Sequence, residues 1–209
     1  MNVADLRFLL PLAAGQRVGV FGDAKRLVET LTGDGLIVKP ISQFQNQSLT
    51  DLESVEFIGS FDHVIIPEFS SGNLDSCLRR VGQFLKPGGW LLIGIHNSES
   101  LYRFLSKTDA VKKTLFSLRK CIRALEENGI QAVCCYGAYE KLEHPQDLIR
   151  LDHSFISEYF FRNIYIPNSR FTAWMLPVLI LISSVGLQRM LFRGIVIVAR
   201  RKMRGNCAD

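Results

Sequence analysis

FDHVIIPEF (residues 61–69) and FLKPGGWLLIGIHN (residues 84–97) form the clearest structural pattern in this chain. Each contains a long apolar run, and the segment between them, 73–85, places leucine and valine at helical spacing. Lys86-Pro87-Gly88-Gly89 ends that helix, because proline and paired glycines cannot continue it. Strand, helix, turn and strand at this length form a crossover unit with parallel strands. We therefore predict strands at 61–66 and 90–95.

Outward from this unit, short apolar runs alternate with helical patterns along most of the chain. We predict further strands at 17–21, 36–41, 131–138 and 192–200, and helices at 4–11, 24–32, 110–129 and 173–184. Residues 140–170 are polar and aromatic and show no clear period. Such alternation indicates an α/β layer architecture in one domain over 1–209.

Composition narrows the function classes. The 209 residues are 47% hydrophobic and 22% charged, which is ordinary for a globular domain with a core. The net charge of +5 owes much to Arg200, Arg201, Lys202 and Arg204. Nucleic-acid binding usually needs a broader basic face, so we expect no nucleic-acid partner.

The cysteines and the N-terminus predict an intracellular protein. Five cysteines occur without a C-x-x-C spacing, which favours buried thiols over disulfides or zinc. His144 and His153, with nearby aspartates, match no metal-ligand spacing, so we expect no metal site. The first ten residues lack the pattern of a secretory signal. We expect a cytoplasmic location, with membrane association left open by one segment.

That segment is FTAWMLPVLILISSVGL, residues 171–187, which contains 17 residues without a charge. Its length is at the lower limit for a membrane span, and Pro177 and Gly186 interrupt it. We predict a buried or surface-docking helix followed by a turn. Peripheral membrane contact through 171–187 remains an open alternative.

The crossover unit resembles the second half of the class I S-adenosylmethionine-dependent methyltransferases. The resemblance lies in Phe61-Asp62, in Leu85-Lys86-Pro87-Gly88-Gly89, and in the spacing between them. It implies a Rossmann-like three-layer α/β sandwich, with a mostly parallel sheet and an antiparallel C-terminal strand. The helix at 173–184 and the strand at 192–200 fit the last two elements of that family. S-adenosylmethionine is the cofactor that the resemblance implies.

The cofactor half departs from the family pattern. There the first strand ends in an acidic residue, followed by Gly-x-Gly-x-Gly, whose glycines let the backbone approach the cofactor. In RVGVFGDAKRL (17–27), Val20 takes the acidic position, and Gly22, Ala24 and Arg26 take the glycine positions. The nearest carboxylate is Asp23. The cofactor loop is therefore degenerate.

The second strand also lacks the family's terminal carboxylate for the ribose. It runs Lys39-Pro40-Ile41-Ser42, and the Ser42 hydroxyl makes only weaker, neutral hydrogen bonds. The 19 residues between Ile41 and Phe61 are few for the complete helix and strand that the family has there. The predicted cofactor-binding residues are Phe21, Gly22, Asp23, Ala24, Ser42 and Glu68.

His96 and Glu68 are the candidate catalytic residues. Both follow predicted strands at the carboxyl edge, where α/β proteins place their sites. His96 is the best general-base candidate, because imidazole titrates near neutral pH. The structural alternatives are a histidine satisfied by a turn and a carboxylate that stabilises a helix N-terminus. The phrase Asn97–Leu101 resembles a turn of small-molecule and sugar-directed members of the family.

Three functions remain open. The first is a methyltransferase acting on a small molecule or glycan, as in cell-surface polysaccharide or secondary-metabolite pathways, with the aromatic, arginine-bearing segment 140–172 as a substrate lid. The second is an inactive binding or scaffold protein with this fold. The third is a binder of a phosphate-bearing ligand at Lys25 and Arg26, which suit an anion and repel a sulfonium. A homodimer or a protein partner is open for each of these functions.

Overall fold

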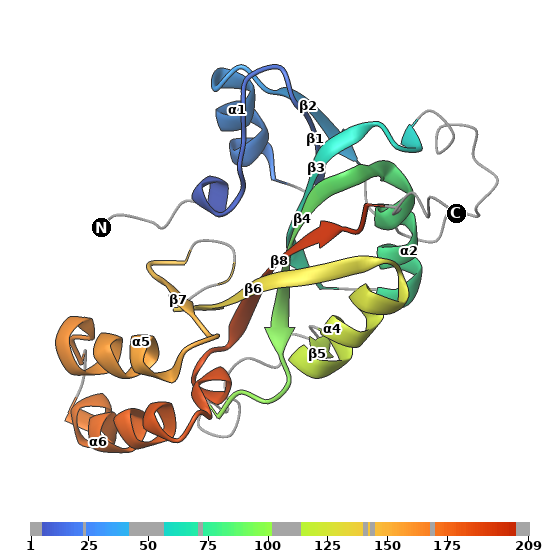
Figure 1. The fold of residues 1–209 in the computed structure, drawn as a ribbon. Coiled ribbons are helices and arrows are strands. Elements are labelled where there is room, and N and C mark those ends of the chain that lie inside the picture. Colours follow the sequence, from blue (N-terminus) through green and yellow to red (C-terminus); the bar gives the residue numbers. More distant parts are fainter. Residues whose placement is uncertain are drawn as a thin grey trace.

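A single mixed sheet organises the part of the chain that the structure, a computed structural model, describes: residues 6–22, 24–41, 57–70, 73–101, 114–139, 142, 145–167 and 170–203. The strand order is β2-β1-β3-β4-β8-β6-β7, with β5 beside the end of β4 (Figure 1). The strands are β1 (Arg17–Phe21), β2 (Ile37–Ile41), β3 (Phe61–Phe69), β4 (Leu85–Asn97), β5 (Leu115–Phe116), β6 (Ile130–Ala138), β7 (Leu148–Arg150) and β8 (Gly194–Arg201).

Helices cover both faces of this sheet. They are η1 (Leu6–Leu9), α1 (Lys25–Gly33), α2 (Leu74–Phe84), α4 (Leu118–Glu127), α5 (Ser154–Tyr159), the π-helical η3 (Phe160–Ile164), α6 (Arg170–Ser184) and η4 (Gln188–Leu191). Strands β2, β1, β3 and β4 are parallel, whereas β8 is antiparallel to both β4 and β6. The predicted three-layer sandwich with an antiparallel C-terminal strand is confirmed.

Alternation along the central strands produces two cores. On β4, Leu91, Ile93 and Ile95 pack with α2 and α4, whereas Leu92 packs with α1 on the other face. The same alternation continues on β8, whose isoleucines and valines face opposite cores. A parallel strand buried on both faces has an unbroken apolar run, which is why these segments were recognisable from sequence.

The crossover helix begins and ends within one residue of its predicted limits. The Asn73 side chain caps α2 by accepting hydrogen bonds from the backbone of Asp75, at 3.0 Å, and of Ser76, at 3.4 Å. The buried stripe of the helix contains Leu74, Cys77, Leu78, Val81 and Phe84. Local capping and periodicity are sufficient to define this helix.

The sequence predicts a turn at Lys86–Gly89, but the structure places these residues in a strand. The segment lies within β4, where Phe61 pairs with Leu85 and His63 with Trp90, so the extra residues form an irregularity opposite Asp62. The Asp62 carboxylate accepts hydrogen bonds from Lys86 Nζ at 2.7 Å and from the Arg17 amide at 2.9 Å. Burial acts to raise the pKa of Asp62, but these partners outweigh it and lower the pKa below its usual value.

Two other predictions need correction. Of the predicted helix 110–129, residues 110–113 lie outside the described residues, and Leu115–Phe116 is a strand rather than part of the helix, which begins at Leu118. Leu115–Phe116 pairs with the end of β4, and the ring centroids of Phe116 and Phe69 lie 5.3 Å apart. The segment 140–170 is more ordered than its sequence indicated, since it contributes β7, α5 and η3. Its aromatic residues Phe160, Phe161 and Tyr165 form a cluster with Tyr139, in which the centroids of contacting rings lie 5.2 to 6.2 Å apart.

The cysteines behave as small apolar side chains. Cys77, Cys121, Cys134 and Cys135 are free thiols. Burial raises the pKa of Cys77, Cys121 and Cys135 to about 12. These three therefore remain protonated and unreactive near neutral pH.

Gly94 allows β3 and β4 to approach closely where β3 bulges. The bulge lies between Ile66 and Phe69, and a Cβ on Gly94 would overlap the backbone carbonyl of Pro67. We expect Gly94→Ala to lower the free energy of unfolding by about 2 kcal/mol or more, because a backbone carbonyl cannot yield as a side chain would. Urea denaturation measures the change.

Gly33→Ala is the matched control for this substitution. Gly33 lies in α1, and no atom lies within 4 Å of its Cβ position. Alanine there should be neutral or stabilise the protein by up to about 1 kcal/mol. Equal stabilities of the two variants would contradict the proposed close approach.

His63 makes stability depend on pH. It is 2% exposed, and its Nε2 lies 2.8 Å from Gln16 Oε1. Burial lowers the pKa of His63 below 6.5, so at lower pH the unfolded chain binds a proton that the native state does not. Stability should therefore fall as the pH drops through this region, by at most about 1.4 kcal/mol per pH unit.

The test compares His63→Gln with His153→Gln, at an exposed position. Denaturation between pH 5 and 7, about the reference value of histidine, should show a shallower pH dependence for His63→Gln and an unchanged one for His153→Gln. If the native protein and both variants showed the same change of stability with pH, His63 would not be the cause of the pH dependence.

Candidate functional site

The strand register brings the predicted site residues to one edge of the sheet. Val20 pairs with Ile65, and Ile65 pairs with Leu92. Gly22, Pro67 and Gly94 each follow two residues later, at the carboxyl ends of parallel strands. This edge lies at the lower end of β4 in Figure 1. Gly22 and Gly94 are at the same height in the sheet and two strands apart, which corresponds to about 10 Å at the usual spacing between strands.

The turn after β1 retains one feature of a cofactor loop. Gly22 has a φ of 86°, a left-handed conformation that favours glycine. The Ala24 amide donates to the Gly22 carbonyl at 3.0 Å, and Ala24 then precedes α1 without a side-chain cap. No atom lies within 4 Å of the Cβ position of Gly22, so its backbone is open on that side.

The other loop positions have different chemistry. Val20 is fully buried in the core below α1, so the position that is acidic in the family holds a packing residue. Lys25 and Arg26 are exposed in the first turn of α1, which contains no acidic residue. Asp23 and Ser42, both predicted to bind the cofactor, lie outside the described residues.

Glu68 and His96 form the centre of the candidate site. His96 Nε2 lies 2.7 Å from Glu68 Oε1, and the two side chains are only 16% and 18% exposed. The bulge of β3 at Pro67–Glu68 places this carboxylate beside β4. An ionised carboxylate only accepts hydrogen bonds, so Nε2 is the donor in this pair. Sequence reasoning selected both residues, and the structure brings them together.

Asn97 has a structural role beside this pair. Its Nδ2 donates to the carbonyls of Arg189, at 2.7 Å, and Phe192, at 2.9 Å, while its Oδ1 accepts from the Glu99 amide at 3.0 Å. These bonds tie the end of β4 to η4 and to the start of β8. In the turn Asn97–Leu101, which resembles a turn of sugar-directed methyltransferases, Asn97 therefore fixes the end of β4.

Glu99 adds a second link that sequence reasoning missed. Its carboxylate accepts from Ser117 at 2.9 Å and pairs with Arg189 Nε at 3.0 Å. The two partners come from the loop before α4 and from η4, distant in sequence. The sequence shows only that an acidic residue lies three positions after His96, so it could not identify the partners of Glu99.

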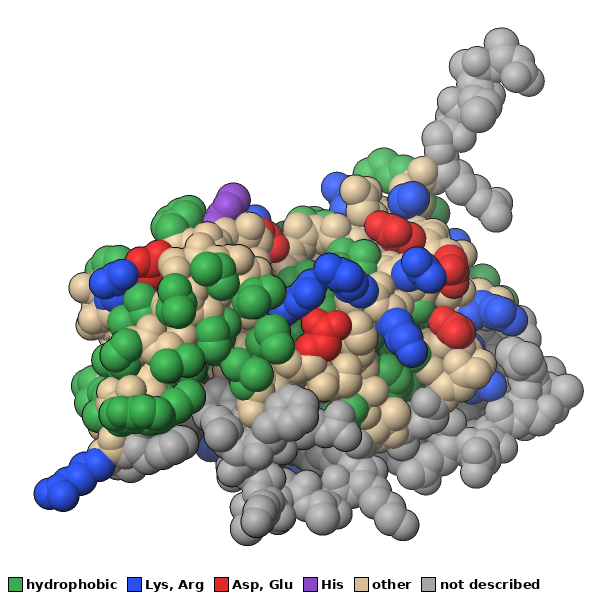
Figure 2. Space-filling view, turned by 90° about the horizontal axis from the view of Figure 1, so that it is seen from below, with side chains coloured by type: hydrophobic (Ala, Val, Ile, Leu, Met, Phe, Trp, Pro, Cys, Tyr) green, Lys and Arg blue, Asp and Glu red, His purple; other side chains and the backbone are tan. Residues whose placement is uncertain are grey.

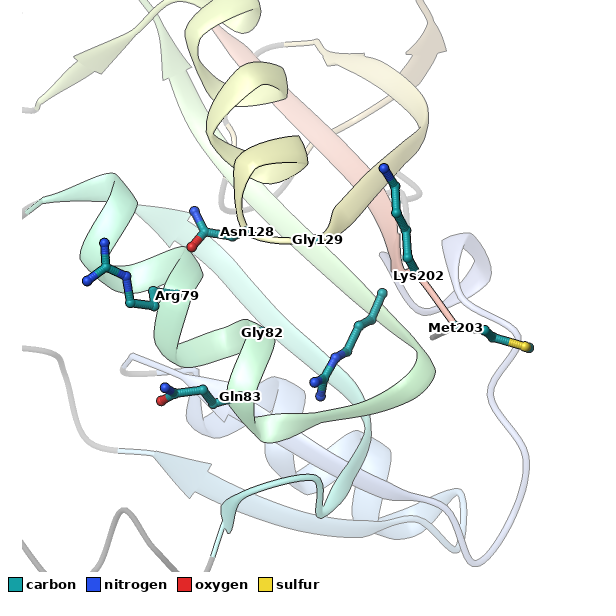
Figure 3. A pocket seen from close by; sticks show the side chains of 8 residues that line it. Arg79, Gly82, Gln83, Asn128, Gly129, Lys202 and Met203 are labelled. Atoms are coloured by element: carbon teal, nitrogen blue, oxygen red, sulfur yellow. The ribbon is translucent and has the colours of Figure 1, made fainter. Parts of the chain in front are cut away.

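The two described pockets lie at the opposite edge of the sheet. One, of about 390 Å³, is lined by the ends of α2, α4 and β8 (Figure 3). Its lining residues are Arg79, Gly82, Gln83, Asn128, Gly129, Arg201, Lys202 and Met203. The other lies near the starts of β1, β2 and β3. Neither adjoins His96. Within the described residues, no group of His, Cys, Asp or Glu side chains is placed to hold a metal ion.

Solved structures of methyltransferases share this fold at low sequence identity. A SAM-dependent methyltransferase from Archaeoglobus fulgidus matches with a TM-score of 0.55 and 16% identity, over 93% of this chain and 90% of that chain. The Haloferax volcanii complex of the Trm112 methyltransferase activator with a methyltransferase matches with a TM-score of 0.55 and 13% identity, over 92% of this chain and 85% of that chain.

A third match was solved with ligands. It is phosphoethanolamine N-methyltransferase 2 from Haemonchus contortus, in complex with phosphomonomethylethanolamine and S-adenosylhomocysteine. The TM-score is 0.50 and the identity 16%, over 95% of this chain and 51% of that chain. No protein-family model and no curated protein matches the sequence. The shared architecture shows that this chain has the fold of the class I S-adenosylmethionine-dependent methyltransferases.

Proposed function

We propose that this protein is an S-adenosylmethionine-dependent methyltransferase that acts on a small molecule or glycan. The observation that carries the proposal is the Glu68–His96 pair, at 2.7 Å, on the carboxyl edge of a methyltransferase-type sheet. Ligand sites of open α/β sheets lie at this edge. Methyl transfer requires that the two reactants be held in line and that a proton be removed from the acceptor.

His96 would remove that proton. Glu68 accepts from Nε2 and thereby fixes the tautomer that leaves Nδ1 basic. Its negative charge also stabilises the imidazolium that forms when Nδ1 takes the proton. The small exposure of both side chains strengthens their interaction, because little water screens it. The pair therefore supports an oxygen or nitrogen acceptor.

The β1 turn would hold the cofactor, which supplies an electrophilic methyl group when bound. The open backbone at Gly22 fits a ligand that approaches closely, and Phe21 and Ala24 flank it. Lys25 and Arg26 suit the carboxylate of the cofactor's methionine portion, since a helix start already favours an anion. The same charges disfavour a nearby sulfonium, so the cofactor would place its sulfur away from them. Asp23, Ser42 and Glu68 complete the proposed cofactor set.

A phosphate-bearing ligand in the same cleft is the second candidate. The exposed pair Lys25 and Arg26, without an acid in the first turn of α1, favours it. An inactive binding protein of this fold is compatible with the buried Val20 at the family's acidic position. Segment 140–172 remains our proposal for a lid over the acceptor, in an arrangement where Arg162 and Arg170 could contact an anionic group.

Titration with S-adenosylhomocysteine tests the cofactor assignment. We expect micromolar binding, and we expect Gly22→Ala to weaken it by about tenfold, or about 1.4 kcal/mol, because the added Cβ would occupy the open space through which the ligand approaches the backbone. Gly15→Ala is the control. Gly15 also has a left-handed φ, of 80°, and open space around its Cβ position, but it precedes β1.

The outcomes separate the candidates. Binding weakened by Gly22→Ala alone supports the cofactor site. Absence of binding up to about 1 mM, equivalent to about 4 kcal/mol, would contradict the methyltransferase proposal. Binding of inorganic phosphate that is lost in Lys25→Ala/Arg26→Ala would then favour the second candidate.

His96→Ala tests the proton transfer. With a labelled methyl donor and a panel of hydroxylated and amino acceptors, we expect the rate to fall by about 10²–10⁴-fold, the usual contribution of a general base. Binding of S-adenosylhomocysteine should not change. Glu68→Gln should lower the rate less and shift its pH profile. Full activity of His96→Ala on an acceptor that the native enzyme methylates would exclude His96 as the base.

A further inference from the structure

Helix α6 exposes an apolar face along its whole length. Trp174, Val178, Leu181 and Val185 recur at intervals of three to four residues, which places them on one side of the helix and the turn that follows it. Trp174 is 72% exposed and Leu181 is 62% exposed. Nothing in the described part of the chain covers this face.

Neighbouring segments extend the exposed area. Helix α5 packs against α6, and large apolar side chains of α5, η3 and the following residues are also open to solvent. We call the whole set the α5–α6 surface; its members are Phe155, Tyr159, Ile164, Ile166, Trp174, Val178, Leu181, Val185 and Leu187. Figure 2 shows hydrophobic side chains gathered over this end of the molecule. Monomeric soluble proteins rarely expose so much contiguous apolar area without a function.

The opposite side of α6 already provides its attachment to the protein. Leu179 and Ser183 are buried, and Leu176, Ile180 and Ile182 pack against the main core. The helix is therefore apolar on both faces, although one face is enough to hold it in place. A helix that is apolar all round is expected inside a core or in contact with lipid.

The geometry of α6 excludes a span within the described chain. It has 15 residues and contains Pro177, and its length of about 22 Å is less than the hydrocarbon thickness of about 30 Å. None of the described helices is long and apolar enough to cross a membrane. Contact with lipid would therefore leave α6 lying in the plane of the interface.

The charges around this surface are predominantly positive. From 153 to 193 the chain contains one acidic residue, Glu158, and four arginines: Arg162, Arg170, Arg189 and Arg193. Glu158 is paired with Arg162 at 2.8 Å, and Arg189 is paired with Glu99 at 3.0 Å. Arg170 is exposed at the start of α6, one turn from Trp174. Tryptophan is enriched where proteins meet the membrane–water interface, and a basic side chain beside it attracts anionic lipid headgroups.

We propose that the α5–α6 surface docks the protein on an anionic lipid bilayer, with α6 in the interface plane. The apolar side chains enter the acyl boundary, and Arg170 contacts phosphate groups at the rim. A protein partner would also bury apolar area, but the excess of arginine at this end of the chain favours a phosphate-rich surface.

The position of this surface agrees with the proposed function. Helix α6 leads into η4, and the Arg189 carbonyl of η4 accepts a hydrogen bond from Asn97. Asn97 directly follows His96 on β4. A docked bilayer would thus lie beside the carboxyl edge of the sheet. Resting on the proposed function, this placement indicates that the acceptor is a lipid-linked molecule.

Vesicle binding tests the docking independently of the cofactor. The chain contains two tryptophans, and Trp90 lies on β4 with the Arg200 guanidinium 5.4 Å from its ring. In a Trp90→Phe background, Trp174 alone reports its surroundings. We expect its emission to shift to shorter wavelength with vesicles of phosphatidylcholine and phosphatidylglycerol, and the protein to cosediment with them. Pure phosphatidylcholine vesicles should bind it more weakly.

Matched substitutions identify the surface. Leu181 and Ile58 are equally exposed, at 62%, but Ile58 lies before β3, outside the α5–α6 surface. Leu181→Glu should lower the vesicle partition coefficient by at least about tenfold, whereas Ile58→Glu should leave it unchanged. Arg170→Glu should reduce the preference for anionic over neutral vesicles. Binding of S-adenosylhomocysteine should be the same in all three variants.

Three results would overturn the proposal. One is native protein that neither cosediments with anionic vesicles nor shifts its Trp174 emission. Another is an equal loss of vesicle binding in Leu181→Glu and Ile58→Glu. The third is a dimer in solution that Leu181→Glu converts to a monomer, because the surface would then join two copies of the chain. A failed cofactor titration would remove the lipid-linked acceptor but not the docking.

Discussion

The contact between the β3 bulge and Gly94 is the constraint on which the candidate site depends. The bulge brings the Pro67 carbonyl against β4, where only a residue without a side chain leaves room. It also changes the direction of the following residue, so that Glu68 reaches His96. A bulge next to an active site commonly serves to aim a side chain in this way. The same irregularity of the sheet therefore determines both the close packing at Gly94 and the contact of Glu68 with His96.

Strand β4 connects the site to the rest of the molecule. It pairs with β3 on one side and β8 on the other, and its last two residues pair with β5. Asn97 then binds η4, which follows α6. The α5–α6 surface and the Glu68–His96 pair are thus attached to the same strand end. This attachment explains how a surface outside the core can be held at a defined place relative to the candidate site.

The cofactor half combines a retained conformation with altered charges. Gly22 keeps the left-handed turn that opens the backbone, whereas Val20 is used for packing. Lys25 and Arg26 make the start of α1 cationic. Backbone shape and side-chain charge are separate requirements of a ligand site, so one can persist while the other changes. A fold shared with methyltransferases leaves the chemistry to be decided at these residues.

The sequence by itself determined the order of the central strands and of α1, α2, α4 and α6, the crossover unit and the edge at which Glu68 and His96 lie. These features follow from local periodicity, from the Asn73 cap and from the handedness of parallel connections, all of which act over short stretches. Only the tertiary structure decided that Glu68 bonds to His96, that Lys86–Gly89 belongs to a strand, and that Leu115–Phe116 pairs with β4. It also decided which face of α6 is exposed, because a helix that is apolar on every side does not indicate from its sequence which side packs on the core. Each of these depends on partners distant in the chain, whose positions are set by packing across the sheet.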